Sequence, residues 1–193
     1  MVTLLVNLYG SKEAFLTEYQ NMLAEKLVGG KPYNLDEETK NLELLKLRFG
    51  ESLLQNCNII VKDVRESRRI NNNVHTTSQG SKTLMNRSFI PFEKLNTTFI
   101  SKGYWPIDYS TETLKPPKLL QETFDEYAKK YSEIKDLRKV VWHHTIGYVD
   151  ITISFDNGDF NFKCLPAHTI VLSYFDERCK NSLLLPDLKL NGY

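Results

Sequence analysis

The sequence has few cysteines, no large excess of one charge and no long apolar run. Its 193 residues include three cysteines, an odd number that disfavours a disulfide framework and predicts free thiols in a reducing compartment. Lysine and arginine total 25 against 24 aspartate and glutamate, so no global field favours nucleic acid or an anionic membrane as a partner. No apolar stretch approaches the roughly 18 residues that a membrane span needs. The composition predicts a globular chain that can bury a core and recognises partners through local surfaces.

The first residues give no targeting signal. Residues 1–8 are apolar but too short for the apolar region of a signal peptide, and no basic segment precedes them. We therefore predict a protein of the nucleus and cytoplasm, with no membrane partner.

Candidate metal ligands are too few and too scattered for a structural zinc site. A tetrahedral site needs about four ligands, commonly with closely spaced cysteine pairs, and the zinc of a RING needs about eight for its two ions. The sequence offers one set without such a pair: His143, His144, Cys164 and His168. We predict no metal and no cofactor, and we interpret Cys164 as a small core residue.

The sequence also lacks a recognisable catalytic group. Cys179 lies between Arg178 and Lys180, which could lower its pKa, but no histidine and acid can be assigned to activate it. The chain is therefore predicted not to be an enzyme.

Helical spacing of apolar residues dominates the first third of the chain. Ser11 is a suitable N-cap for a helix that ends at Gly29. Asp36 is predicted to cap a second helix that ends at Gly50, and Ser52 opens a third, long helix reaching about residue 70. Three helices with short connections predict a bundle.

The third predicted helix carries a basic cluster with three open interpretations. A solvated face is the default for such a cluster, and the alternatives are a partner contact or an internal ion-pair site. Its members are Lys62, Arg65, Arg68 and Arg69.

The pattern changes after the third helix. Residues 72–88 contain almost nothing apolar, which predicts a linker. Beyond it, 95–101 and 139–143 have the alternation of strands, and a helix starts at Pro116-Pro117.

A β-hairpin is predicted over 149–164. Apolar and polar residues alternate on both sides of Asn157-Gly158, a dipeptide that favours a type I′ turn. With these two residues as the turn, the expected cross-strand pairs are Phe155 with Phe160, Ile153 with Phe162 and Ile151 with Cys164.

The last segment begins with Pro166, a suitable first residue for an amphipathic helix. The apolar run 183–186 then has no predicted element to pack on. We interpret the sequence as a fragment, cut inside a further small helical domain and also at its apolar start.

Several motifs, taken together in order and spacing, resemble one family. Residues 42–51 are LELLKLRFGE and residues 61–71 are VKDVRESRRIN, preceded by LYGSK at 8–12 and followed by FISKGYWP at 99–106. This arrangement resembles the cullin-homology region of the cullin family, and within it the cullin-like scaffolds of the anaphase-promoting complex, a ubiquitin ligase of mitosis and the cell cycle. RKVVW at 138–142 and PAHTIVL at 166–172 are similar to two further segments of the family.

The resemblance implies an α+β fold in a fixed order. Residues 1–71 would be the end of a helical bundle, 72–88 a linker, 89–165 an α/β cullin-homology domain and 166–193 an incomplete winged helix.

The resemblance also implies a scaffolding function. The α/β sheet would bind a zinc RING subunit by strand addition, and the RING would recruit the ubiquitin-conjugating enzyme; other subunits of the complex would be further partners. Strand addition uses main-chain hydrogen bonds for affinity and side-chain pockets for specificity. The residues predicted to bind the partner are Leu95, Thr97, Phe99, Trp105, Val141, Trp142, Val149 and Ile151.

One alternative comes from a different functional class. The helix at Pro166 and the basic cluster could belong to a winged-helix protein that binds nucleic acid. The nearly neutral net charge and the lack of a recognition helix argue against it, so no nucleic-acid partner is predicted.

Overall fold

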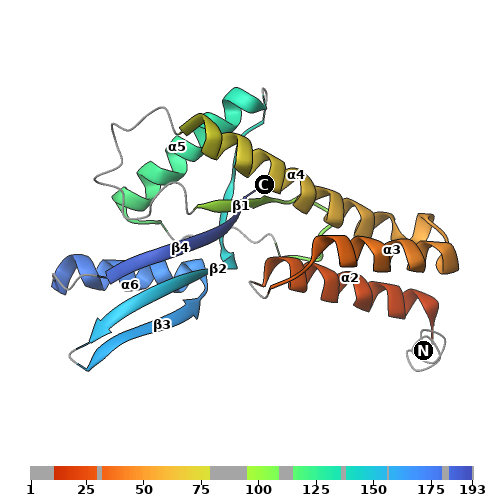
Figure 1. The fold of residues 1–193 in the computed structure, drawn as a ribbon, viewed down its shortest axis with the longest axis horizontal. Coiled ribbons are helices and arrows are strands. Elements are labelled where there is room, and N and C mark those ends of the chain that lie inside the picture. Colours follow the sequence, from red (N-terminus) through yellow and green to blue (C-terminus); the bar gives the residue numbers. More distant parts are fainter. Residues whose placement is uncertain are drawn as a thin grey trace.

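A computed structural model describes residues 11–29, 32–78, 95–108, 115–135, 138–155, 157–179 and 183–192. A helical bundle forms one end of the molecule and a mixed sheet with two helices forms the other (Figure 1). Within the described residues, no helix is both long and apolar enough to cross a membrane.

The bundle consists of α2 (Lys12–Val28), α3 (Leu35–Phe49), the short 3-10 helix η1 (Ser52–Leu54) and α4 (Gln55–Ser78). Ser11 caps α2 as predicted, because its side chain accepts a hydrogen bond from the amide of Ala14. The predicted cap of α3 is wrong by two residues: Asn34 caps the helix, and Asp36 donates its amide to the Asn34 side chain. Gly50 ends α3 at a φ of 92°, a conformation that glycine adopts without steric cost.

The bundle core is a continuous apolar cluster. Leu16, Leu23, Leu42, Leu54 and Ile60 are among the side chains that bury together. Burying each removes an apolar side chain from water, worth about 1.5–3 kcal/mol. This core confirms that the apolar periodicity of the first third of the sequence encodes helices that pack on one another.

Helix α4 continues beyond its predicted end near residue 70. It reaches Ser78 and therefore includes the first part of the predicted linker 72–88; residues 79–88 lie outside the described residues. Ile70 and Val74 are one helical turn apart and are buried in the sheet's core, so the apolar stripe of α4 runs on through the asparagine-rich segment. That segment is polar because two of its side chains bind the sheet, as described below.

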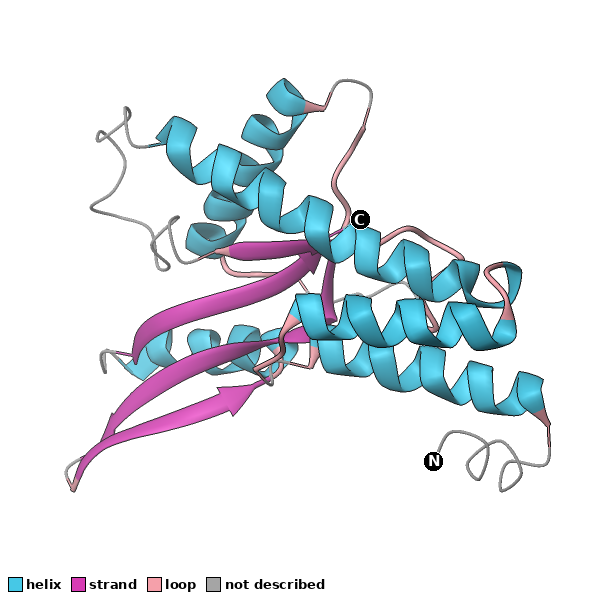
Figure 2. Ribbon diagram, turned by 45° about the vertical axis from the view of Figure 1, so that its right-hand side comes forward, coloured by secondary structure: helices cyan, strands magenta, loops and turns pink. Residues whose placement is uncertain are grey.

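The sheet contains four strands in the order β1-β4-β2-β3. These are β1 (Asn96–Phe99), β2 (Trp142–Phe155), β3 (Gly158–Cys164) and β4 (Leu183–Gly192), and the helices α5 (Lys118–Ile134) and α6 (Pro166–Cys179) complete the domain. The strand predicted at 139–143 is wrong for its first three residues, because β2 begins at Trp142; residues 142–143 and the predicted strand 149–155 belong to this one long strand. In Figure 2, α6 lies beside β2 and β4, while α4 passes beside β1.

The hairpin of β2 and β3 is confirmed, but its predicted register is wrong. Ile151 pairs with Phe162, Ile153 with Phe160 and Phe155 with Gly158. The residues between the strands are therefore 156 and 157, and Gly158 opens β3 at a φ of 128°. The shift is an even number of residues, so the apolar side chains still share one face.

The apolar C-terminal run does have a packing partner, contrary to the prediction. β4 lies in the middle of the sheet, parallel to β1 and antiparallel to β2. Pairing with β1 joins segments about ninety residues apart, which local patterns cannot reveal. Helix α6 forms at Pro166 as predicted, and the division into a winged helix from residue 166 stays a prediction.

A second apolar cluster lies between the sheet and its helices. It contains Leu95, Phe124, Tyr127, Val149 and Ile170, and α4 contributes to it through Ile70 and Val74. Because α4 also supplies residues to the bundle core, one helix joins the two halves of the molecule.

Candidate partner-binding surface

Strand β1 lies at one edge of the sheet, and its outer side faces helix α4. An uncovered edge would leave main-chain N–H and C=O groups without partners. Here four side chains of α4, spaced one helical turn apart, provide the hydrogen-bond partners that a neighbouring strand would otherwise supply. We call Asp63, Ser67, Asn71 and His75 the α4 polar row.

Each member of the α4 polar row binds the main chain of the segment that contains β1. Asp63 accepts from the amide of Ser101 at 2.9 Å, and Ser67 accepts from the amide of Phe99 at 2.8 Å. His75 Nε2 lies 3.0 Å from the carbonyl oxygen of Leu95. The contacts run antiparallel, so later residues of the helix bind earlier residues of the strand.

Asn71 provides the most complete of these contacts. Its Nδ2 donates to the carbonyl of Thr97 at 2.8 Å, and its Oδ1 accepts from the Thr97 amide at 3.1 Å. Tyr127 on α5 also donates its hydroxyl to Oδ1, at 2.5 Å. Burial raises the pKa of the Tyr127 hydroxyl, which keeps this donor protonated.

Asp63 also fixes the loop that follows β1. Its carboxylate accepts from the hydroxyl of Ser101 at 3.0 Å and from Trp105 Nε1 at 2.9 Å. Trp105, one of the predicted partner-binding residues, is only 3% exposed. Its indole is buried because Asp63 supplies the acceptor that its N–H needs.

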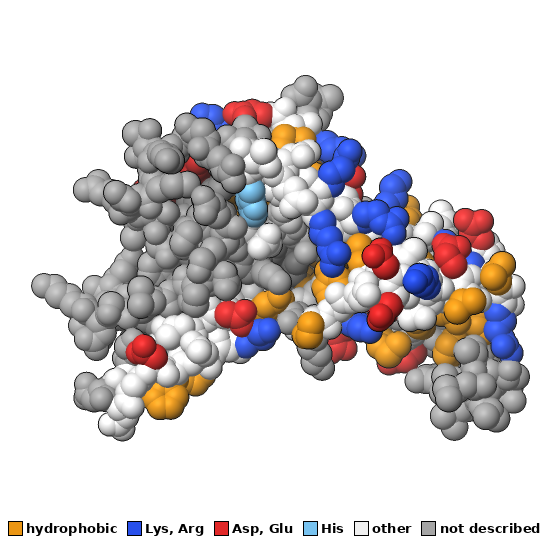
Figure 3. All heavy atoms as spheres, viewed as in Figure 1, with side chains coloured by type: hydrophobic (Ala, Val, Ile, Leu, Met, Phe, Trp, Pro, Cys, Tyr) orange, Lys and Arg blue, Asp and Glu red, His pale blue; other side chains and the backbone are white. Residues whose placement is uncertain are grey.

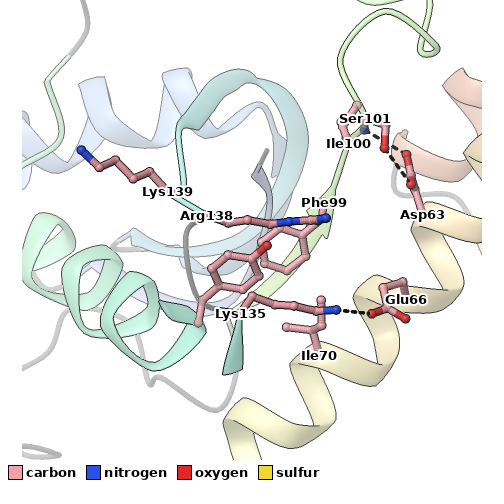
Figure 4. A pocket seen from close by; sticks show the side chains of 10 residues that line it. Asp63, Glu66, Ile70, Phe99, Ile100, Ser101, Lys135, Arg138 and Lys139 are labelled. Atoms are coloured by element: carbon pink, nitrogen blue, oxygen red, sulfur yellow. Dashed lines mark hydrogen bonds and ion pairs between the residues drawn. The ribbon is translucent and has the colours of Figure 1, made fainter. Parts of the chain in front are cut away.

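A pocket of about 250 Å³ lies between α4, the end of β1 and the segment after α5 (Figure 4). Lys135 binds Glu66 across it at 3.2 Å, and Arg138 extends along the ring of Phe99, while Lys139 points away. The hydrogen bond from Arg69, followed by that from Lys135, lowers the pKa of Glu66. The ion pair of Lys135 with Glu66 holds the end of α5 against α4.

The basic cluster on α4 is divided among several contacts. Arg69 forms an ion pair with Glu66 at 2.8 Å, Arg65 donates to the Thr39 hydroxyl, and Arg68 lies 5.2 Å from the centre of the Tyr33 ring. In Figure 3, acidic and basic side chains are intermixed over the bundle. Three of the four basic side chains therefore make contacts within the protein, and one of these contacts is an ion pair, as in the third interpretation of the sequence.

Most of the eight predicted partner-binding side chains lie inside the protein. Leu95, Thr97, Val149 and Ile151 are buried, as is Trp105. Phe99 and Trp142 are half-buried. The ring of Phe99 stacks on that of Tyr131 with 4.5 Å between ring centres, and the ring of Trp142 stacks on that of Phe124 with 4.7 Å between ring centres. Val141 is 57% exposed but precedes β2.

The residues of β1 also differ in the side of the strand that their main-chain N–H and C=O groups face. The N–H and C=O of Thr97 face α4, and successive residues of a strand point these groups to opposite sides. The groups of Asn96 and Thr98 therefore face β4, where Thr98 is paired with Asn191. For pairing with a strand beside β1, Thr98 is the relevant residue, and the sequence interpretation had named Thr97.

The cysteines and histidines of the described residues do not form a metal site. No group of three or more possible metal ligands occurs among the described residues. Burial raises the pKa of the Cys57 thiol to about 11, so it is protonated and unreactive at neutral pH. The Cys164 sulfur lies 3.2 Å from the Thr169 hydroxyl, and the side chain of Cys179 lies outside the described residues.

Comparison with known proteins gives one matching domain family. The cullin alpha+beta domain matches residues 99–191. This match includes β1, the hairpin, α6 and β4 in part or in full.

Curated relatives extend the similarity to the bundle. Anaphase-promoting complex subunit 2 of Arabidopsis thaliana is 34% identical over 175 residues, covering 91% of this chain and 20% of the relative. The human protein of that name is 31% identical over 183 residues, 95% of this chain and 22% of the relative. Mouse Cullin-4A is 28% identical over 179 residues, 91% of this chain and 22% of the relative. The chain thus spans about a fifth of the length of these relatives.

Proposed function

Because the chain is related to the cullins, with a cullin alpha+beta domain and 31–34% identity to anaphase-promoting complex subunit 2 proteins, we propose that it is part of a cullin-like scaffold of a ubiquitin ligase of this type. Its sheet binds a zinc RING subunit through strand addition. The RING in turn recruits the ubiquitin-conjugating enzyme, and other subunits of the complex bind elsewhere on the whole protein. The similarity to subunit 2 proteins over both bundle and sheet is the observation that carries this proposal.

The sheet order supports one place for the incoming strand. Most of the predicted partner-binding residues lie on or beside β1 and β2, and these two strands are separated by one strand position. The outer side of β1 is occupied by the α4 polar row. The position between β1 and β2 is occupied by β4 in this chain. An incoming strand in this position would pair with both β1 and β2.

β4 is poorly suited to a central strand. It contains Pro186, and proline lacks the N–H that a central strand donates. Its pairing with β2 is interrupted by two register shifts, whereas β3 pairs with β2 without a break. A strand with a full set of donors would form more hydrogen bonds in this position, and we propose that the RING strand replaces β4 there.

Binding of the RING subunit by proline variants tests this placement. Thr98→Pro removes the β1 donor that faces the central position, so affinity should fall by about tenfold or more. Asn161→Pro in β3 is the matched control, because the alternation of the β2–β3 pairs points the Asn161 N–H to the open edge; this variant should bind normally. Circular dichroism must show that both variants fold. Loss of binding in Asn161→Pro alone would place the partner at the β3 edge, and binding by neither wild type nor variants would refute the scaffold function.

Ubiquitin chemistry is proposed to come from the partners. A discharge assay with purified conjugating enzyme should show transfer only when the RING subunit is present, and Cys164→Ser and Cys179→Ser should leave it unchanged. Transfer by this chain without a RING would contradict the proposal. We further propose that the protein works in the nucleus and cytoplasm, which imaging of the tagged whole protein can test. The comparisons do not support the nucleic-acid-binding alternative.

A further inference from the structure

The spacing of the α4 polar row matches that of a β-strand. Four residues of an α-helix rise about 6.0 Å, and two residues of a strand rise about 6.4–6.8 Å. Side chains one helical turn apart can therefore reach alternate residues of a strand over a long distance. The observed contacts follow this match from Ser101 back to Leu95.

These contacts satisfy only one side of β1. They use the main-chain groups of Leu95, Thr97, Phe99 and Ser101. The groups of the intervening residues point the other way, toward the central position. The helix thus replaces a neighbouring strand on the outer side and leaves the inner side available for pairing.

We propose that the α4 polar row is a fixed pairing partner of β1 that keeps the central strand position open to a partner's strand. This inference rests on the proposed function, in that the incoming strand belongs to the RING subunit. β1 is four residues long, and among the described residues β4 is the one strand that pairs with it. When β4 leaves, only α4 and the core beneath hold β1 in line.

Asp63, Ser67 and Asn71 are positioning residues in this account. They do not touch the incoming strand, because β1 lies between them and the central position. Their effect is to remove the cost of ordering β1 at the moment of binding. When β1 is already ordered, less of the interaction energy of the incoming strand is offset by the entropy lost in ordering β1.

Amide hydrogen exchange of the chain alone tests the first half of the proposal. Ser67→Ala removes the acceptor of the Phe99 amide, so exchange at Phe99 should accelerate by about tenfold or more. Ser67→Thr keeps a hydroxyl and should restore protection. Thr76→Ala is the control on the same helix, because its hydroxyl binds the carbonyl of Asn72 and not β1. Unchanged exchange at Phe99 in Ser67→Ala would overturn the proposal, whether or not any RING subunit binds.

Binding of the RING subunit tests the second half. Ser67→Ala should weaken binding by about threefold to tenfold, and Thr76→Ala should not. Chemical denaturation confirms that each variant is folded under the assay conditions. Faster exchange at Phe99 with unchanged affinity would refute the role in binding. If the wild-type chain does not bind a RING subunit, the proposed function fails, while the exchange result still decides whether α4 holds β1.

Discussion

The two outer edges of the sheet differ in how their main chains are protected. The β1 edge is closed by the α4 polar row, with hydrogen bonds of 2.8–3.1 Å to the main chain. At the β3 edge no further strand pairs among the described residues, and Phe160 and Phe162 are 48% and 44% exposed. β3 carries the charge of Lys163, a feature that discourages association at an open edge. The β1 edge is thus protected by a helix, and the β3 edge has only its side chains for protection among the described residues.

The comparison also separates two possible sites for a partner. The β3 edge accepts a strand without displacing anything, but it contacts only one strand of the sheet. The central position contacts both β1 and β2 and requires β4 to leave. The predictions below either remove the difference between the edges or measure it.

The largest effect is expected for Asn71→Leu at the β1 edge. This variant leaves the Thr97 amide and carbonyl without their partner in a buried site, while the Tyr127 hydroxyl retains its contact with the Thr97 hydroxyl. Each unsatisfied buried group costs about 1–3 kcal/mol, so unfolding free energy should fall by on the order of 3 kcal/mol or more. Urea denaturation measures the loss. Asn72→Leu is the control on the exposed face of α4, and an equal loss there would show that the polar row contributes nothing specific.

A smaller effect is expected for Gly158→Val at the β3 edge. Gly158 has a φ of 128° with open space around the position of a Cβ atom, so the cost arises from conformation and not from a clash. A β-branched residue at such an angle costs on the order of 1–3 kcal/mol. Asp159→Val places the same side chain on the next residue of β3 and should be nearly neutral by the same denaturation assay. No loss in Gly158→Val would contradict the observed start of β3.

The smallest effect concerns Glu66, beside the α4 polar row. Its pKa is lowered below its ordinary value of 4.5 by the hydrogen bonds from Arg69 and Lys135. The stability it contributes is therefore present above that value and is lost as pH falls through the lower folded pKa. The side chain is 38% exposed, so the contribution is small. Glu66→Gln should slightly flatten the loss of stability as pH falls below about 4.5; identical acid profiles for Glu66→Gln and wild type would refute this coupling.

Local features of the fold were predictable because local forces set them. Ser11, Gly50 and Pro166 mark helix ends as expected, since capping depends on residues within one turn. The hairpin register was not predictable, because Asn157-Gly158 favours a turn centred on itself while pairing brought Gly158 into β3. β4 was missed because its partner β1 is distant in sequence and Pro186 disfavours a strand.

The candidate site was harder to predict than the fold. Alternating apolar residues such as Val149 and Ile151 give the same signal whether they face a core or a partner, and here they face the core. The polar row had a visible signal, because Asp63, Ser67, Asn71 and His75 recur every four residues. Polar residues at that spacing normally indicate a solvated helix face, so only the position of β1 reveals their role.

The most direct test is hydrogen exchange of this chain with and without the zinc RING subunit. We expect residues 183–192 to lose protection when the RING subunit binds, while 95–101 stay protected by α4 and by the new strand. Protection retained at 183–192 together with new protection at 158–164 would contradict it, because the partner would then lie on the β3 edge.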